Sequence, residues 1–90
     1  MENNFHTKDI SGDRFLVTGG AGFIGSHIAE YLLKNGAKKV RVLDNMVNGF
    51  ETNLAILQKY PAFEFIKGDI RDAETCLLAC DGIDYVSHQA

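Results

Sequence analysis

The sequence has no excess of positive charge and no long apolar run. Nine Lys and Arg stand against 12 Asp and Glu in 90 residues, giving a net charge of −3. The basic residues are scattered, so nothing indicates a nucleic-acid-binding stripe. No apolar run approaches the length that crosses a bilayer. We therefore expect neither a nucleic-acid nor a membrane partner.

The first 13 residues are polar and of mixed charge. They do not have the basic and apolar regions of a secretory signal peptide. We expect them to form a loose lead-in to the first strand of a cytoplasmic protein, with residues 14–90 forming the N-terminal portion of one longer domain.

Cysteine is scarce. The sequence has only Cys76 and Cys80, four residues apart on a predicted helix. Neither lies near a cluster of other ligand-type residues. We therefore expect two free core cysteines in a reducing compartment, and neither a disulfide nor a metal site.

Glycine, in contrast, is concentrated at one informative place. The apolar run that ends at Val17 predicts a buried strand, and Gly19, Gly22 and Gly25 follow it with the spacing G-x-x-G-x-x-G. An apolar-periodic helix begins within this loop. Such glycines allow a tight turn, close approach of the backbone to a pyrophosphate, and close packing of helix on strand. The helix N–H groups would then face the phosphates, and those of Phe23 and Ile24 are candidates.

A second signal lies downstream. The segment from Lys39 to Leu43 predicts another strand, and Asp44 ends it 19 residues after Gly25. A carboxylate there can accept both ribose hydroxyls of an adenosine and would repel a 2′-phosphate. Arg41 lies inside the strand, where it is poorly placed to bind a 2′-phosphate. The pattern therefore favours NAD over NADP.

Strand and helix patterns alternate along the whole chain. This order predicts an α/β fold of the Rossmann type, with parallel strands in the order 3-2-1-4 and right-handed crossovers. We expect strands at 14–18, 39–43, 63–66 and 83–88, and helices at 22–35, 51–60 and 73–80, the last capped by Asp72. The apolar spacing predicts three inward helix faces: Ile24, Ile28, Tyr31 and Leu32; Leu54, Leu57 and Tyr60; and Cys76, Leu77 and Cys80.

Four motifs in order resemble the extended short-chain dehydrogenase/reductase family, and most closely its nucleotide-sugar 4-epimerases and 4,6-dehydratases. The segment 18–27, TGGAGFIGSH, is similar to the family's glycine motif, and Leu43-Asp44-Asn45 is similar to its ribose loop. The segment 68–72, GDIRD, resembles the family's adenine segment, and the ending His88-Gln89-Ala90 resembles H-x-A-A. The glutamine in the last motif favours UDP-N-acetylhexosamine 4-epimerases.

This resemblance implies the remaining site residues. Asp69 and Ile70 would lie against the adenine, although an acid at a strand end also caps turns. The loop residues Asn45, Asn48 and Gly49 would reach ribose or phosphate, although asparagine is common in any turn. Cofactor binding is thus assigned to 13 residues: Gly19, Gly22, Phe23, Ile24, Gly25, Asp44, Asn45, Asn48, Gly49, Asp69, Ile70, Gln89 and Ala90.

The family's catalytic residues are a Tyr and a Lys in a Y-x-x-x-K motif. Four residues after Tyr31, Tyr60 and Tyr85 stand Asn35, Glu64 and Gln89. We therefore expect no catalytic residue among these 90, and an inactive, self-associating chain if it occurs alone, because the last strand would be an unpaired apolar edge. The full-length protein would act on a UDP-sugar as a homodimer. The alternatives are a 4,6-dehydratase and a non-catalytic dinucleotide-binding regulator of the same fold.

Overall fold

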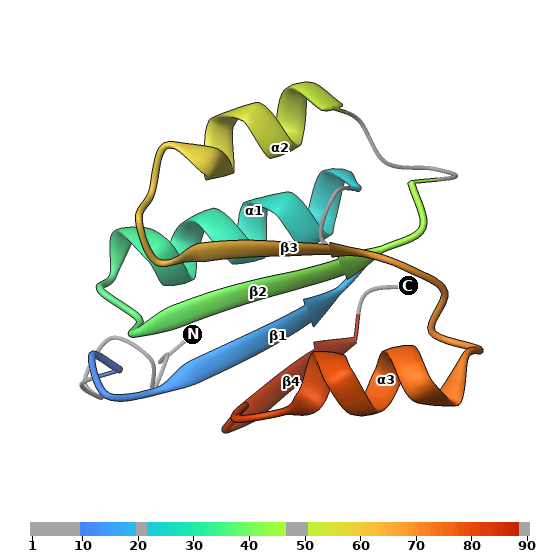
Figure 1. The fold of residues 1–90 in the computed structure, drawn as a ribbon. Coiled ribbons are helices and arrows are strands. Elements are labelled where there is room, and N and C mark those ends of the chain that lie inside the picture. The colour runs from blue at the N-terminus through green and yellow to red at the C-terminus, as the bar shows by residue number, and fades with distance from the viewer. Residues whose placement is uncertain (1–9, 20–21, 47–50, 89–90) are drawn as a thin grey trace.

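The computed structural model describes residues 10–19, 22–46 and 51–88. Strands and helices alternate along them, as the sequence predicts (Figure 1). In chain order they are β1 (Arg14–Thr18), α1 (Phe23–Lys34), β2 (Lys39–Asp44), α2 (Glu51–Gln58), β3 (Phe63–Lys67), α3 (Ala73–Cys80) and β4 (Tyr85–His88). Within these residues, none of the helices is long and apolar enough to cross a membrane.

The four strands form one parallel sheet in the order β3-β2-β1-β4, which confirms the predicted topology. The register places Thr18 beside Leu43 and His88, and Asp44 beside Lys67. The carboxyl ends of all four strands therefore lie along the same edge of the sheet. β1 and β4 meet where the strand order reverses, which is where α/β sheets bind ligands.

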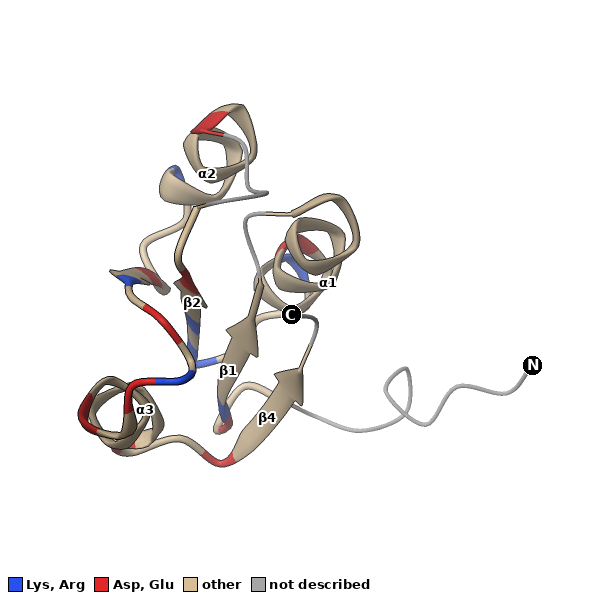
Figure 2. Ribbon diagram, turned by 90° about the vertical axis from the view of Figure 1, so that its right-hand side faces the viewer, with Lys and Arg blue, Asp and Glu red and all other residues tan. Residues whose placement is uncertain are grey.

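Helices cover both faces of the sheet. α1 and α2 lie on one face and α3 on the other (Figures 1 and 2). Alternate residues of β1 serve the two sides: Phe15 and Val17 belong to the core under α1 and α2, whereas Leu16 packs with Leu43 and Ala79 under α3. This alternation explains the unbroken apolar run from Phe15 to Val17 in β1, because both faces of this strand are buried.

Local signals fix the helix ends. Gly36 follows α1 with a φ of 85°, a left-handed conformation that glycine adopts without strain and that commonly ends a helix. Asp72 caps α3 as predicted: its Oδ1 accepts the Glu74 N–H at 3.1 Å, and its Oδ2 accepts the Thr75 hydroxyl at 3.1 Å. Both ends agree with the sequence analysis.

Arg41 attaches α3 to the sheet. Its Nε donates to Glu64 Oε1 on β3 at 2.7 Å, and its Nη1 donates to the carbonyl oxygens of Ala79 at 2.7 Å and Asp81 at 2.9 Å. A cation at these carbonyls satisfies orphan acceptors at the end of the helix and opposes the negative end of its dipole. Arg41 therefore has a structural role, consistent with the prediction that it is poorly placed to bind a 2′-phosphate.

Two of the predicted helix faces need correction. In α1 the buried residues are Gly25, Ala29, Leu32 and Leu33, so Ile24 lies outside this stripe and is 63% exposed. In α3 only Ala79 is buried; Leu77 is 74% exposed, and Cys80 is exposed rather than part of the core. A helix of eight residues that are mostly apolar gives no clear periodicity. The face of α3 that the sequence predicted to be buried was therefore wrong. The face predicted for α2 is confirmed in Leu54 and Leu57, which are buried.

β4 begins two residues later than predicted. Ile83 packs from outside the strand on the core under α3, and Asp84 accepts the Arg14 N–H at 2.7 Å. Within the strand, Tyr85 stacks on Phe15 with ring centroids 5.4 Å apart, yet Tyr85 and Val86 remain 45% and 56% exposed. β4 therefore lies at the edge of the sheet with apolar side chains exposed, as the sequence analysis expects.

Candidate functional site

The candidate site is the edge of the sheet where the strands end and the helices begin. At this edge the backbone N–H of Gly19 donates to the Leu43 carbonyl at 2.8 Å, and that of Gly68 donates to the Asp44 carbonyl at 3.1 Å. These bonds extend the strand pairing past the sheet. The turns after β1, β2 and β3 therefore lie side by side, and the sequence motifs that they carry meet in space.

The first of these turns leads into α1. Gly19 has a φ of 72°, the left-handed conformation that a tight turn after β1 requires. Gly22 is the N-cap of α1 and makes no side-chain cap hydrogen bond, and the first turn holds no acidic residue. The first N–H groups of a helix have no partner within the helix, and together with its dipole they attract an anion. The start of α1 therefore fits a phosphate group.

The geometry of Gly22 separates a structural need from a ligand need. Its φ is −75°, which any residue can adopt, and an added Cβ would lie 3.4 Å from the Gly19 carbonyl oxygen, an ordinary van der Waals contact. The fold alone therefore has room for a side chain at this position. A glycine here is accounted for by close approach of a ligand to the backbone.

Asp44 lies at the end of β2 and is only 8% exposed. Its Oδ1 accepts the backbone N–H of Met46 at 2.7 Å, and Met46 takes the unusual φ of 67°. This turn holds the carboxylate at the end of β2, the strand that pairs with β1. Asn45 is exposed in the same turn.

Asp69 lies in the turn after β3 and is bound to Arg71. The Arg71 guanidinium donates from Nε to Oδ1 at 3.1 Å and to Oδ2 at 3.0 Å, and from Nη2 to Oδ2 at 2.6 Å. The backbone N–H of Arg71 adds a bond to Oδ1 at 2.8 Å. These bonds hold the pKa of the Asp69 carboxyl at about 2 and raise that of Arg71. Asp69 is therefore an ionised acceptor over the whole physiological range.

Thr18 and His88 join the ends of β1 and β4. Thr18 Oγ1 and His88 Nδ1 lie 2.7 Å apart in a partly buried hydrogen bond. His88 stands at the point where the strand order reverses, directly beside the glycine turn. The sequence assigned no role to this pair or to Arg71. The short spacing Asp69-x-Arg71 within a turn is a signal that could have revealed the second of these contacts.

Other predicted site residues lie nearby or outside the described residues. Ile70 packs on the core under α3, and Cys76 Sγ donates to its carbonyl at 2.9 Å. The side chain of Ile24, which the helix face predicts to be packed, is 63% exposed. That of Phe23 is 72% exposed and makes a T-shaped contact with the His27 ring, with centroids 4.7 Å apart. Four predicted site residues lie outside the described residues: Asn48, Gly49, Gln89 and Ala90.

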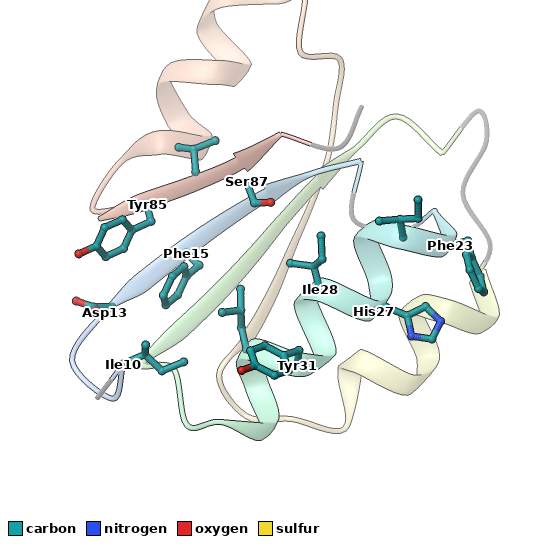
Figure 3. Close-up of a pocket in the computed structure, with 12 residues that line it drawn as sticks. Ile10, Asp13, Phe15, Phe23, His27, Ile28, Tyr31, Tyr85 and Ser87 are labelled. Carbon is teal, nitrogen blue, oxygen red and sulfur yellow. The ribbon is translucent and has the colours of Figure 1, made fainter. Parts of the chain in front are cut away.

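A large apolar groove lies on the side of the sheet that carries α1. Its volume is about 810 Å³, and Phe15 and Tyr85 from the sheet face Ile28 and Tyr31 from α1 across it (Figure 3). The groove extends along α1 to Phe23, which is how the exposed first turn of the helix comes to line it. It adjoins the start of α1, and its lining is mostly apolar.

The chain belongs to the NAD dependent epimerase/dehydratase family, whose model matches residues 15–90. A 3β-hydroxysteroid dehydrogenase/Δ5→4-isomerase of Mycobacterium tuberculosis is 40% identical over 77 residues, 86% of this chain and 19% of that protein.

Two solved structures add to this finding. A double mutant of DesIV, a dTDP-glucose 4,6-dehydratase from Streptomyces venezuelae, was solved with NAD bound; it is 43% identical and superposes with a TM-score of 0.79, over 86% of this chain and 26% of that one. A UDP-N-acetylglucosamine 4-epimerase from Methanobrevibacter ruminantium is 36% identical with a TM-score of 0.75, over 89% of this chain and 24% of that one.

The chain thus spans about a fifth to a quarter of the length of these relatives. The likeness confirms the predicted family and the Rossmann-type fold. NAD, the cofactor expected from the sequence, is the cofactor of this family and is bound in the dehydratase structure.

Proposed function

We propose that this chain binds the adenosine and pyrophosphate of NAD in a nucleotide-sugar 4-epimerase. The observation that carries the proposal is the start of α1. Its N-cap makes no side-chain hydrogen bond and its first turn holds no acidic residue, it follows a left-handed glycine turn after β1, and the neighbouring strand β2 ends at the buried carboxylate of Asp44. This combination of an anion site and a hydroxyl acceptor matches a dinucleotide.

Each part of the chain has a proposed task. The backbone N–H groups of Phe23, Ile24 and Gly25 donate to the pyrophosphate, and Gly19 and Gly22 let it approach. Asp44 accepts from the adenosine ribose, with Asn45, Asn48 and Gly49 beside it. Asp69 and Ile70 bind the adenine, and Gln89 and Ala90 are further residues assigned to the cofactor. When bound, NAD would take a hydride from the sugar and return it.

The sugar is proposed to be a UDP-hexose or UDP-N-acetylhexosamine. The related epimerase from Methanobrevibacter ruminantium is named for UDP-N-acetylglucosamine, and Gln89 in the last motif favours the same group. We further propose that the protein works as a cytoplasmic homodimer. No Tyr in the chain has a Lys four residues later. The chemical step is therefore assigned to residues beyond the present 90, and these residues alone are expected to be inactive.

The experiment is to incubate the full-length protein with UDP-N-acetylglucosamine, UDP-glucose and dTDP-glucose and to identify the products by NMR. A 4-epimerase gives a mixture of the two C4 epimers without net consumption of NAD. A 4-keto-6-deoxy product would instead support the 4,6-dehydratase, which the 43% identity to the Streptomyces enzyme favours as the second candidate. Binding of NAD with no conversion of any sugar would support a dinucleotide-binding regulator.

A further inference from the structure

One residue occupies the whole carboxylate of Asp69. Oδ1 accepts from the backbone N–H of Arg71 and from its Nε, and Oδ2 accepts from Nε and Nη2, at distances between 2.6 and 3.1 Å. A carboxylate offers about four lone-pair positions to donors. Arg71 therefore uses the acceptor capacity that an adenine would need.

This pairing has opposite consequences for different purines. The 6-amino group of adenine is a donor, so it binds a bare carboxylate but competes with a guanidinium. A purine with an oxygen at position 6, such as hypoxanthine, carries an acceptor there. The Asp69 carboxylate repels that oxygen, whereas the guanidinium of Arg71 can donate to it.

We propose that Arg71 determines base selectivity at the adenine end of the cofactor site. It weakens recognition of adenine by competing for Asp69, and it allows a 6-oxo purine to bind by supplying donors. This inference rests on the proposed function, in which Asp69 contacts the base. The side chain of Arg71 is 86% exposed, so it can leave the carboxylate and turn toward the base without disturbing the core.

The test compares two dinucleotides whose purines differ at position 6 and, as a consequence, at N1, which is an acceptor in adenine and carries a proton in hypoxanthine. The dissociation constants of NAD and of nicotinamide hypoxanthine dinucleotide are measured by calorimetry, at one ionic strength, for the full-length protein and for Arg71→Gln. We expect the ratio of the hypoxanthine constant to the NAD constant to rise about tenfold in Arg71→Gln, the scale of one hydrogen bond to a charged group. Both ligands carry the same phosphates, so the lost positive charge affects them equally and cancels in the ratio.

Two further variants control the result. Lys67→Gln removes the same charge from an exposed residue two positions before Asp69, and its ratio should match the wild type. Arg71→Lys keeps the charge but loses the planar guanidinium and its several donors. The ratio of the hypoxanthine constant to the NAD constant should therefore rise less than in Arg71→Gln. If circular dichroism shows that Arg71→Gln is not folded, Arg71→Lys carries the test, and an unchanged ratio in it overturns the inference.

The outcomes separate this inference from the proposed function. A wild-type protein that binds neither dinucleotide overturns both. A protein that binds NAD, with a ratio in Arg71→Gln unchanged within twofold, overturns the role of Arg71 alone. Asp69→Asn replaces the carboxylate by an amide that can donate as well as accept, so its ratio should fall toward one. An unchanged ratio in Asp69→Asn would remove Asp69 from the base contact, and the role of Arg71 with it.

Discussion

Two helices start at the same edge of the sheet, and their first turns are built in opposite ways. α3 begins at Asp72, whose carboxylate accepts the Glu74 N–H and the Thr75 hydroxyl, and Glu74 adds a negative charge to its first turn. α1 begins at Gly22, with no side-chain cap and no acidic residue. The chain thus supplies a carboxylate at the start of α3 and none in the first turn of α1.

The difference shows how a ligand site can be distinguished from an ordinary helix start. An N-cap carboxylate stabilises a helix by about 1 kcal/mol relative to alanine but by only a few tenths relative to glycine, so Gly22 gives up little local stability. A carboxylate at Gly22 would place a negative charge where the proposed pyrophosphate binds. We call the uncapped beginning of α1 the open start and the capped beginning of α3 the closed start, and we expect the open start to serve a ligand and the closed start to serve the fold.

The largest effect is expected at the open start. Gly22→Val should abolish NAD binding, because the side chain would fill the space into which the pyrophosphate comes. The sheet should still form, since the φ of −75° and the 3.4 Å contact leave room for a Cβ. Calorimetry measures the binding, and circular dichroism measures the fold. Gly12→Val is the matched control, because a Cβ at Gly12 meets no atom within 4 Å and lies at the other edge of the sheet.

Retained NAD affinity in Gly22→Val with a native spectrum would mean that the glycine serves the fold alone. The contrast between α1 and α3 would then lose its functional meaning.

The next largest effect is expected at Asp44, at the end of β2. Asp44→Asn should weaken NAD binding by about 1–3 kcal/mol, the scale of a lost hydrogen bond to a charged group. It should also reduce the preference for NAD over NADP, because the 2′-phosphate would no longer meet a carboxylate. Parallel titrations with both dinucleotides measure this. Asp81→Asn, an exposed acid after α3, should leave both affinities unchanged. Equal affinities for NAD and NADP in the wild type would contradict the ribose assignment.

How far the sequence predicts these features depends on how local each one is. The strand order, the glycine turn at Gly19 and the cap at Asp72 were predicted correctly, because each is set by residue type and spacing along the chain. The orientation of α3 was wrong at Leu77 and Cys80, because which face of a short apolar helix is buried depends on what packs against it. The pairing of Arg71 with Asp69 was not predicted, although the spacing of the two residues within a turn is a signal for it, and the number of bonds in this pairing depends on side-chain geometry.

A substitution at the closed start of α3 should change stability and leave NAD affinity unchanged, the reverse of the effect expected for Gly22→Val. Asp72→Ala removes the cap of α3 and should lower the free energy of unfolding by about 1 kcal/mol, as measured with urea. NAD affinity should stay within twofold of the wild type. Gly22→Ala, at the same position of α1, should lower the free energy of unfolding by less than Asp72→Ala does, because Gly22 has no side-chain cap hydrogen bond to lose and the change removes only the preference for glycine over alanine at an N-cap. A loss of stability as large in Gly22→Ala as in Asp72→Ala would remove the contrast between the two helix starts.

The smallest effect, on the pH dependence of stability, is expected at the other end of α3. There Arg41 binds the carbonyl oxygens that end the helix and the carboxylate of Glu64. The hydrogen bond from Arg41 lowers the pKa of Glu64 below its ordinary value of 4.5. A carboxyl whose pKa is depressed in the folded state stabilises the fold above its unfolded pKa, and this contribution is lost as pH falls through the folded value. Stability should therefore decline as pH drops below about 4.5, and less steeply in Arg41→Met, where Glu64 has lost its main partner. Urea unfolding at a series of acidic pH values, with an NMR titration of Glu64, measures this.

Lys39→Met is the matched control, because Lys39 lies 3.6 Å from Glu64 and is far more exposed than Arg41. A Glu64 titration that is the same in the wild type and in Arg41→Met would show that the arginine binds the end of α3 without stabilising the charge on β3.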